Sequence, residues 1–94
     1  MNWSLDDVPV VAGTALTFVP RDGSDPIVFD DVARRLHRLP GPTATIWAAI
    51  DSQRTLSAVV DLVAALHGAD VADVTADVVR AVEQLAALGL VQRT

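Results

Sequence analysis

Residues able to ligate a metal or to move protons are few and scattered in this chain of 94 residues. Its two histidines, His37 and His67, lie in different expected elements, and it has no cysteine. A zinc site needs three or four ligands, and a nucleophilic serine needs a base held beside it. Neither a Gly-x-Ser-x-Gly turn nor a glycine-rich phosphate loop occurs. We therefore expect no catalytic residues, no metal and no cofactor, and predict that the chain is not an enzyme.

Three arginines form a more informative cluster. Arg34, Arg35 and Arg38 gather on one segment of β-strand character, and His37 lies among them. On an edge strand, charges of this kind protect against pairing with another chain. Alternatively, the edge is open to a guest peptide, whose main-chain hydrogen bonds give affinity and whose acidic side chains the arginines attract. Both interpretations stay open at this point.

A second feature is a surplus of small and apolar residues on the last expected helix. Its core stripe repeats at spacings of three and four and consists of Val71, Val74, Val78, Val82 and Leu85. Further apolar residues lie outside that stripe and suit the floor of a shallow groove between this helix and the arginine-bearing strand. A helix wedged between two neighbours explains them equally well. The candidate peptide-binding residues are Arg34, Arg35, Leu36, His37, Arg38, Ala72, Ala76, Val79 and Arg80.

The first part of the chain reads as short strands. We expect strands at residues 14–19, 27–29 and 34–39, separated by turn-forming residues and ended by Pro40-Gly41-Pro42. Residues 8–11 are a weaker candidate for a leading strand. Leu36 and Leu39 cannot share one face of a regular strand, which predicts a bulge or an early strand end.

The remainder reads as three helices. The first starts at Pro42 and runs to residue 50, with Trp47 as a core anchor; the second is capped by Thr55 and stopped by Gly68. Asp70 is the expected cap of the third, which ends at Gly89, and Leu90-Val91 returns onto the core. The expected stripe of the second helix is Leu56, Val59, Val60, Val63 and Leu66.

The resulting fold class is α+β, a winged helix-turn-helix-like domain in which a three-stranded antiparallel meander precedes three helices. We expect residues 1–13, which include Trp3, to be a mobile or weakly structured N-terminus, and residues 14–94 to form the single domain. Twelve acidic residues against seven arginines give a net charge of −5, which argues against nucleic acid as the main ligand. No 18-residue apolar run and no basic leader segment is present, so we expect a cytoplasmic protein without a membrane partner.

The run from Leu39 to Leu56 resembles the signature of PqqD-like proteins. Leu39 keeps the family's spacing to Ile46-Trp47, and the later family positions in register are Ile50, Asp51, Arg54, Thr55 and Leu56. Residues 85–91 are similar to the family's closing Leu-x-x-Leu-Gly-Leu-Val motif, and residues 28–30 and 34–39 to its second and third strands. The resemblance covers about residues 14–92. Pro40-Gly41 and Ser52 depart from the family's Asn-Pro and Gly, which weakens assignment to a strict subfamily such as true pyrroloquinoline quinone biosynthesis.

This resemblance implies a RiPP recognition element, a domain that binds the leader of a ribosomally made precursor peptide. In such domains the leader adds as a further strand on the third strand and packs against the third helix. A partner, such as a radical enzyme, a cyclase or a leader peptidase, then does the chemistry, and the domain is a non-catalytic peptide chaperone.

Two rival functions share this outline. A DNA-binding winged helix needs a basic recognition helix, but the third helix has Asp73, Asp77 and Glu83 against Arg80 alone. A self-associating assembly module would pair through the edge strand.

Overall fold

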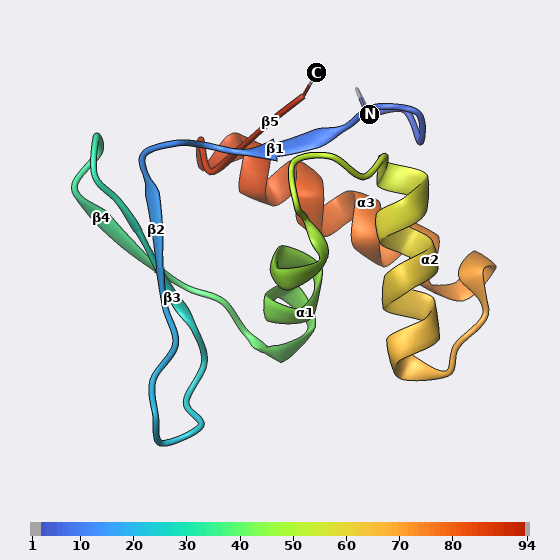
Figure 1. The fold of residues 1–94 in the computed structure, drawn as a ribbon, viewed down its shortest axis with the longest axis horizontal. Coiled ribbons are helices and arrows are strands. Elements are labelled where there is room, and N and C mark those ends of the chain that lie inside the picture. Colours follow the sequence, from blue (N-terminus) through green and yellow to red (C-terminus); the bar gives the residue numbers. More distant parts are fainter. Residues whose placement is uncertain (1–2, 94) are drawn as a thin grey trace.

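The computed structural model describes residues 3–93, which form three helices and two small antiparallel sheets (Figure 1). The elements are β1 (Pro9–Val11), β2 (Ala15–Phe18), β3 (Ile27–Asp30), β4 (Arg35–Arg38), α1 (Gly41–Ala49), α2 (Leu56–His67), α3 (Val71–Ala87) and β5 (Val91–Arg93). The expected α+β class, with a three-stranded antiparallel sheet and three helices, is confirmed. Within the described residues, no helix is long and apolar enough to cross a membrane.

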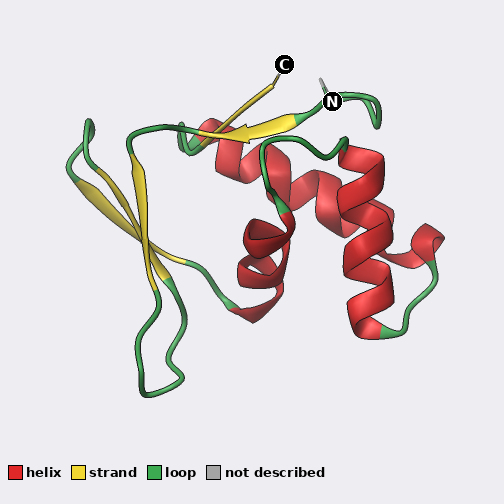
Figure 2. Ribbon diagram, in the orientation of Figure 1, coloured by secondary structure: helices red, strands yellow, loops and turns green. Residues whose placement is uncertain are grey.

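The β2-β3-β4 sheet lies at one end of the molecule, and α1 lies between it and α2 (Figure 2). Val28 of β3 is paired with Thr17 of β2 and His37 of β4, and this row faces the helices. The neighbouring residues on each strand point to the opposite, outer face, because side chains alternate along a strand. β4 ends at Arg38, so of the two expected alternatives, a bulge or an early strand end, the structure has the early end. Leu36 is therefore 70% exposed on the outer face, whereas Leu39 is 3% exposed in the core.

The second sheet joins the two ends of the domain. Val11 of β1 is paired with Val91 of β5, so the leading strand and the C-terminal return both exist. The N-terminal segment also accepts hydrogen bonds from the start of α2, from Leu56 N–H to the Asp7 carbonyl at 2.7 Å among them. Trp3 is buried in the core, where the sequence suggested a loosely packed side chain. Mobility of residues 1–13 in solution stays a prediction.

The helices begin and end where local signals place them. Thr55 Oγ1 accepts from Ala58 N at 3.2 Å, and Gly68 ends α2 in the left-handed conformation at φ 61°. Asp70 occupies the N-cap position of α3, but its side chain makes no capping hydrogen bond within the described chain. The predicted N-cap position is therefore correct, but the prediction that the Asp70 side chain caps the helix is wrong.

The core is built from one face of each helix and from β3. Trp47 anchors it as expected, and its indole Nε1 donates to Thr17 Oγ1 at 3.0 Å, which ties α1 to the sheet. Two expected core residues are instead exposed, Leu66 in the last turn of α2 and Val71 at the first position of α3. Both lie at helix ends.

Candidate functional site

The outer edge of β4 is open along the part of the chain that the structure describes. The sheet order is β2-β3-β4, and the N-terminal strand β1 pairs with β5 instead of covering β4. Leu39 N–H donates to the Pro26 carbonyl at 2.9 Å, so the main-chain groups of Leu39 point toward β3. Because these directions alternate along an antiparallel strand, those of Leu36 and Arg38 point to the open edge. This edge offers two donors and two acceptors to an added strand.

The side chains of β4 are divided between the two faces of the sheet. Arg35 and His37 pair with the buried Asp30 and Val28, and so lie on the inner face. Leu36 and Arg38 lie on the outer face. The arginines of this strand therefore flank an added strand from both sides.

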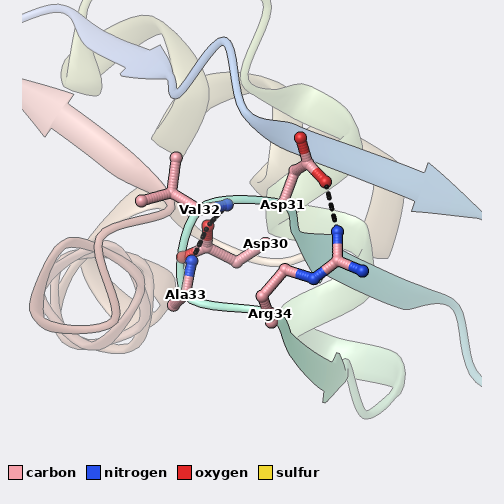
Figure 3. Close-up of polar contacts among 5 residues, drawn as sticks. All are labelled: Asp30, Asp31, Val32, Ala33 and Arg34. Carbon is pink, nitrogen blue, oxygen red and sulfur yellow. Dashed lines mark hydrogen bonds and ion pairs between the residues drawn. The ribbon is translucent and has the colours of Figure 1, made fainter.

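Arg34 lies just before β4, in the turn, and not in the strand as expected. It adopts a left-handed conformation, with φ 57°. Its guanidinium reaches back to Asp31 at 3.0 Å (Figure 3) and lies 5.4 Å from the centre of the Phe29 ring. Arg34 is thus already engaged by the turn that it closes.

Asp30 holds that turn from within. Its carboxylate Oδ1 accepts from the backbone N–H groups of Val32 at 3.0 Å and Ala33 at 3.2 Å (Figure 3). An aspartate that bonds the backbone two and three residues ahead is typical of a tight reversal. The turn fixes the start of β4 and hence the residues that reach the edge.

A hollow of about 340 Å³ lies beside β4, between the strand and the C-terminal half of α3. Its lining residues come from β4, the following linker, α1 and α3; they are Leu36, His37, Arg38, Leu39, Pro40, Thr43, Gln84, Leu85 and Leu88. Leu88 is a half-exposed apolar side chain opposite the strand edge. A strand added to β4 lies against this hollow, since neighbouring strands are about 4.8 Å apart.

The other half of the predicted site lies elsewhere. Ala72, Ala76, Val79 and Arg80 line a separate hollow of about 600 Å³ together with Leu5 of the N-terminal segment. At ~100° per residue, the centre of this set lies about 140° around the helix axis from the centre of Gln84, Leu85 and Leu88 beside β4. The structure therefore does not join the predicted strand and helix residues into a single groove. Val79 is also 7% exposed, so it packs on the core and does not project outward.

Gln84 of α3 and Leu88, its C-cap residue, line the hollow beside β4 and were not among the predicted site residues. Leu88 directly follows Ala87, the last residue of α3, and its apolar character outside the core stripe was the available signal. Periodicity identifies a surplus apolar residue on a helix, but it does not say which flank meets the strand.

The comparison with known families agrees with this architecture. The family described as Coenzyme PQQ synthesis protein D (PqqD) matches residues 27–91. The chain belongs to the PqqD family. No curated protein and no solved structure matches the chain.

The PqqD match begins with β3 and ends at the first residue of β5, so it contains β4, all three helices and the hollow between β4 and α3. PqqD membership implies a peptide-binding adaptor in the biosynthesis of pyrroloquinoline quinone or another ribosomally made product. It also implies a modifying enzyme as partner.

Charge at the PqqD-type edge is available for a ligand. Arg34, Arg54 and Arg80 each pair with an aspartate three residues before them. Over residues 3–93, neither Arg35 nor Arg38 forms such an ion pair. Both guanidinium groups belong to β4, whose outer edge has no partner strand among the described residues.

Proposed function

We propose that this domain binds the leader of a ribosomally made precursor peptide by strand addition to β4 and presents it to a modifying enzyme in the cytoplasm. One observation carries the proposal: the edge-facing main-chain groups of Leu36 and Arg38 border a hollow lined by α3. The domain itself supplies no catalytic step. Holding the leader raises the local concentration of substrate at the enzyme, which increases the rate without any new chemistry.

The energetics require side-chain contacts as well as main-chain ones. Hydrogen bonds to the edge-facing groups of two residues contribute about 0.5–1.5 kcal/mol each, about 2–6 kcal/mol together. A micromolar complex needs about 8 kcal/mol. Burying one leucine-sized side chain adds about 1.5–3 kcal/mol, which an apolar leader residue gains by packing on Leu88. We therefore expect a leader with at least one large apolar residue whose side chain enters the hollow beside β4.

The rival functions fit the site less well. A DNA-binding winged helix needs a basic recognition helix, but Arg80, the one basic residue of α3, is 3.6 Å from Asp77. The other charged side chains of α3 are acidic and would repel the DNA phosphate groups. Self-pairing of two β4 strands brings the arginines of both copies to one edge, where like charges on facing strands are destabilising.

The test is calorimetry with synthetic leaders of the precursor peptides encoded beside this gene. The informative variants are Leu36→Pro, which removes the edge-facing N–H and the leucine side chain, and Leu36→Ala, which removes only the side chain. Proline is tolerated on an edge strand, so the fold should persist, as circular dichroism would verify. We expect Leu36→Pro to weaken binding clearly more than Leu36→Ala. Equal effects of the two variants, or no saturable binding of any encoded leader, would contradict strand addition.

A further inference from the structure

Two rows of side chains cross the outer face of the β2-β3-β4 sheet and end at its open edge. Leu16, Phe29 and Leu36 lie directly beside one another across the three strands. The exposed fractions at the two ends of this row are 59% for Leu16 and 70% for Leu36. All three side chains of this first row are apolar. Phe29 in the middle is partly buried, and the Arg34 guanidinium lies 5.4 Å from the centre of its ring.

The second row lies two residues away along each strand. Phe18 and Ile27 are its first two members, and Arg38 is the third. An apolar row and a row that ends in a guanidinium thus reach the edge side by side. Leu36 and Arg38 are also the residues whose main-chain groups face that edge.

A fourth strand extends each row by one residue. Side chains directly opposite on neighbouring strands lie about 4.5–5.5 Å apart, close enough for apolar contact or for an ion pair. The guest residue beside Leu36 gains most if it is apolar, because it then continues the row from Leu16 to Leu36. The guest residue beside Arg38 gains most if it is acidic, because that guanidinium forms no ion pair within residues 3–93.

The acidic preference survives the net charge of −5 of the chain. Exposed charges more than about 8 Å apart are largely screened at physiological salt. An ion pair with Arg38 acts at a shorter distance, so the local attraction exceeds the repulsion from the rest of the surface.

The geometry points to a leader that is recognised on the outer sheet face as well as in the hollow beside β4. On the outer face, the recognised leader residues are an acidic one and, two positions later in the leader, an apolar one. This inference rests on the proposed strand addition. The order follows from an antiparallel guest, the arrangement that both pairs of the existing sheet have, because such a strand passes Arg38 before Leu36. The guest residue between these two points into the hollow beside β4, toward His37 and Leu88.

The experiment selects binders from a display library of random 12-residue peptides, with the folded 94-residue domain as bait. We expect the wild-type domain to enrich Asp or Glu followed two positions later by an apolar residue. Arg38→Glu should exchange the acidic preference for a basic one and weaken the best wild-type peptide about tenfold. Leu36→Gln should remove the apolar preference. Amide shifts of the ¹⁵N-labelled domain on adding that peptide should be largest at Leu36 and Arg38.

Matched controls separate these effects from changes in charge or fold. Arg21→Glu makes the same charge change in the exposed β2–β3 loop, and Leu66→Gln makes the same polar change on exposed α2. Both variants should still enrich peptides in which an acidic residue is followed two positions later by an apolar one.

The outcomes distinguish the two proposals. If no peptide is enriched, or the shifts map away from β4, strand addition itself fails and the outer-face readout fails with it. If peptides bind at β4 without the acidic–x–apolar pattern, with the reverse order, or with a pattern that Arg38→Glu does not change, only the outer-face readout is overturned.

Discussion

Trp47 of α1 donates its indole N–H to the Thr17 hydroxyl of β2 at 3.0 Å, and this is a side-chain hydrogen bond that joins a helix to the three-stranded sheet. The indole body is buried in the core, while Thr17 on the sheet is exposed, so the bond lies at the border between core and surface. This contact sets the sheet against α1 and thereby helps to position β4 beside α3.

Removing the acceptor of that bond should destabilise the domain. Thr17→Val keeps the shape of the side chain but leaves the indole N–H without its partner, at a cost of about 1 kcal/mol. For a domain of this size, that corresponds to a fall in Tm of about 4–8 °C. Thr17→Ser retains the hydroxyl and should lose less. Thermal unfolding that gives the valine and serine variants the same Tm would rule the contact out as a stabilising one.

The N-cap residues of α2 and α3 should differ in what they contribute to the free energy of unfolding. Thr55 bonds Ala58 N–H, so Thr55→Ala should cost about 1 kcal/mol of the free energy of unfolding. Asp70 makes no such bond, so Asp70→Ala should cost clearly less. Urea unfolding of both variants measures the difference. Thr55→Ser serves as the control that keeps a capping oxygen, and a larger loss from Asp70→Ala would be unexpected on this structure.

Two leucines near the end of α3 should separate stability from binding. Leu85 is 1% exposed, and Leu85→Ala should cost about 2–5 kcal/mol of the free energy of unfolding through lost burial and a cavity. Leu88 is 47% exposed, and Leu88→Ala should change stability much less. Under the proposed function Leu88→Ala should still weaken leader binding, by about tenfold. Calorimetry and chemical unfolding on the same samples measure both quantities, and unchanged leader affinity of Leu88→Ala would remove that residue from the site.

Asp51 should titrate below an ordinary aspartate. The backbone N–H of Arg54 at 2.7 Å, and then that of Gln53 at 2.9 Å, bond its Oδ1 and lower the pKa of the carboxyl group; the Arg54 guanidinium adds a smaller effect. Because the folded pKa is lowered, the resulting stability is present above the unfolded pKa of about 3.9 and is lost as pH falls through the folded value.

Carboxylate ¹³C NMR titration checks this directly, with a midpoint for Asp51 below about 3.9 as the expected result. Asp51→Asn keeps an acceptor for both N–H groups but no longer titrates, so its stability should depend less on pH between about 2 and 4. A normal midpoint for Asp51 would mean that the backbone N–H groups of Gln53 and Arg54 do not bond its carboxylate in solution.

Local features of the sequence were enough to predict most elements of this domain. The spacing of apolar residues, Thr55 and Gly68 located the helices, because side-chain period and capping depend on residues within a few positions of each other. Alternation likewise predicted that Leu36 and Leu39 would not share a face. The family signature in residues 39–56 predicted the family, and with it the strand that carries the candidate site.

Contacts between distant segments had to come from the tertiary structure. The spacing of apolar residues showed which residues of the third helix lie outside the core stripe, but not which side of the helix meets β4. Ala72 and Val79 were therefore predicted to lie beside that strand, whereas Gln84 and Leu88 are the residues that line the hollow next to it. The pairing of β1 with β5 joins segments at opposite ends of the chain. Such relations depend on how completed elements pack together, a choice made by burial over the whole domain and not encoded in any short stretch of residues.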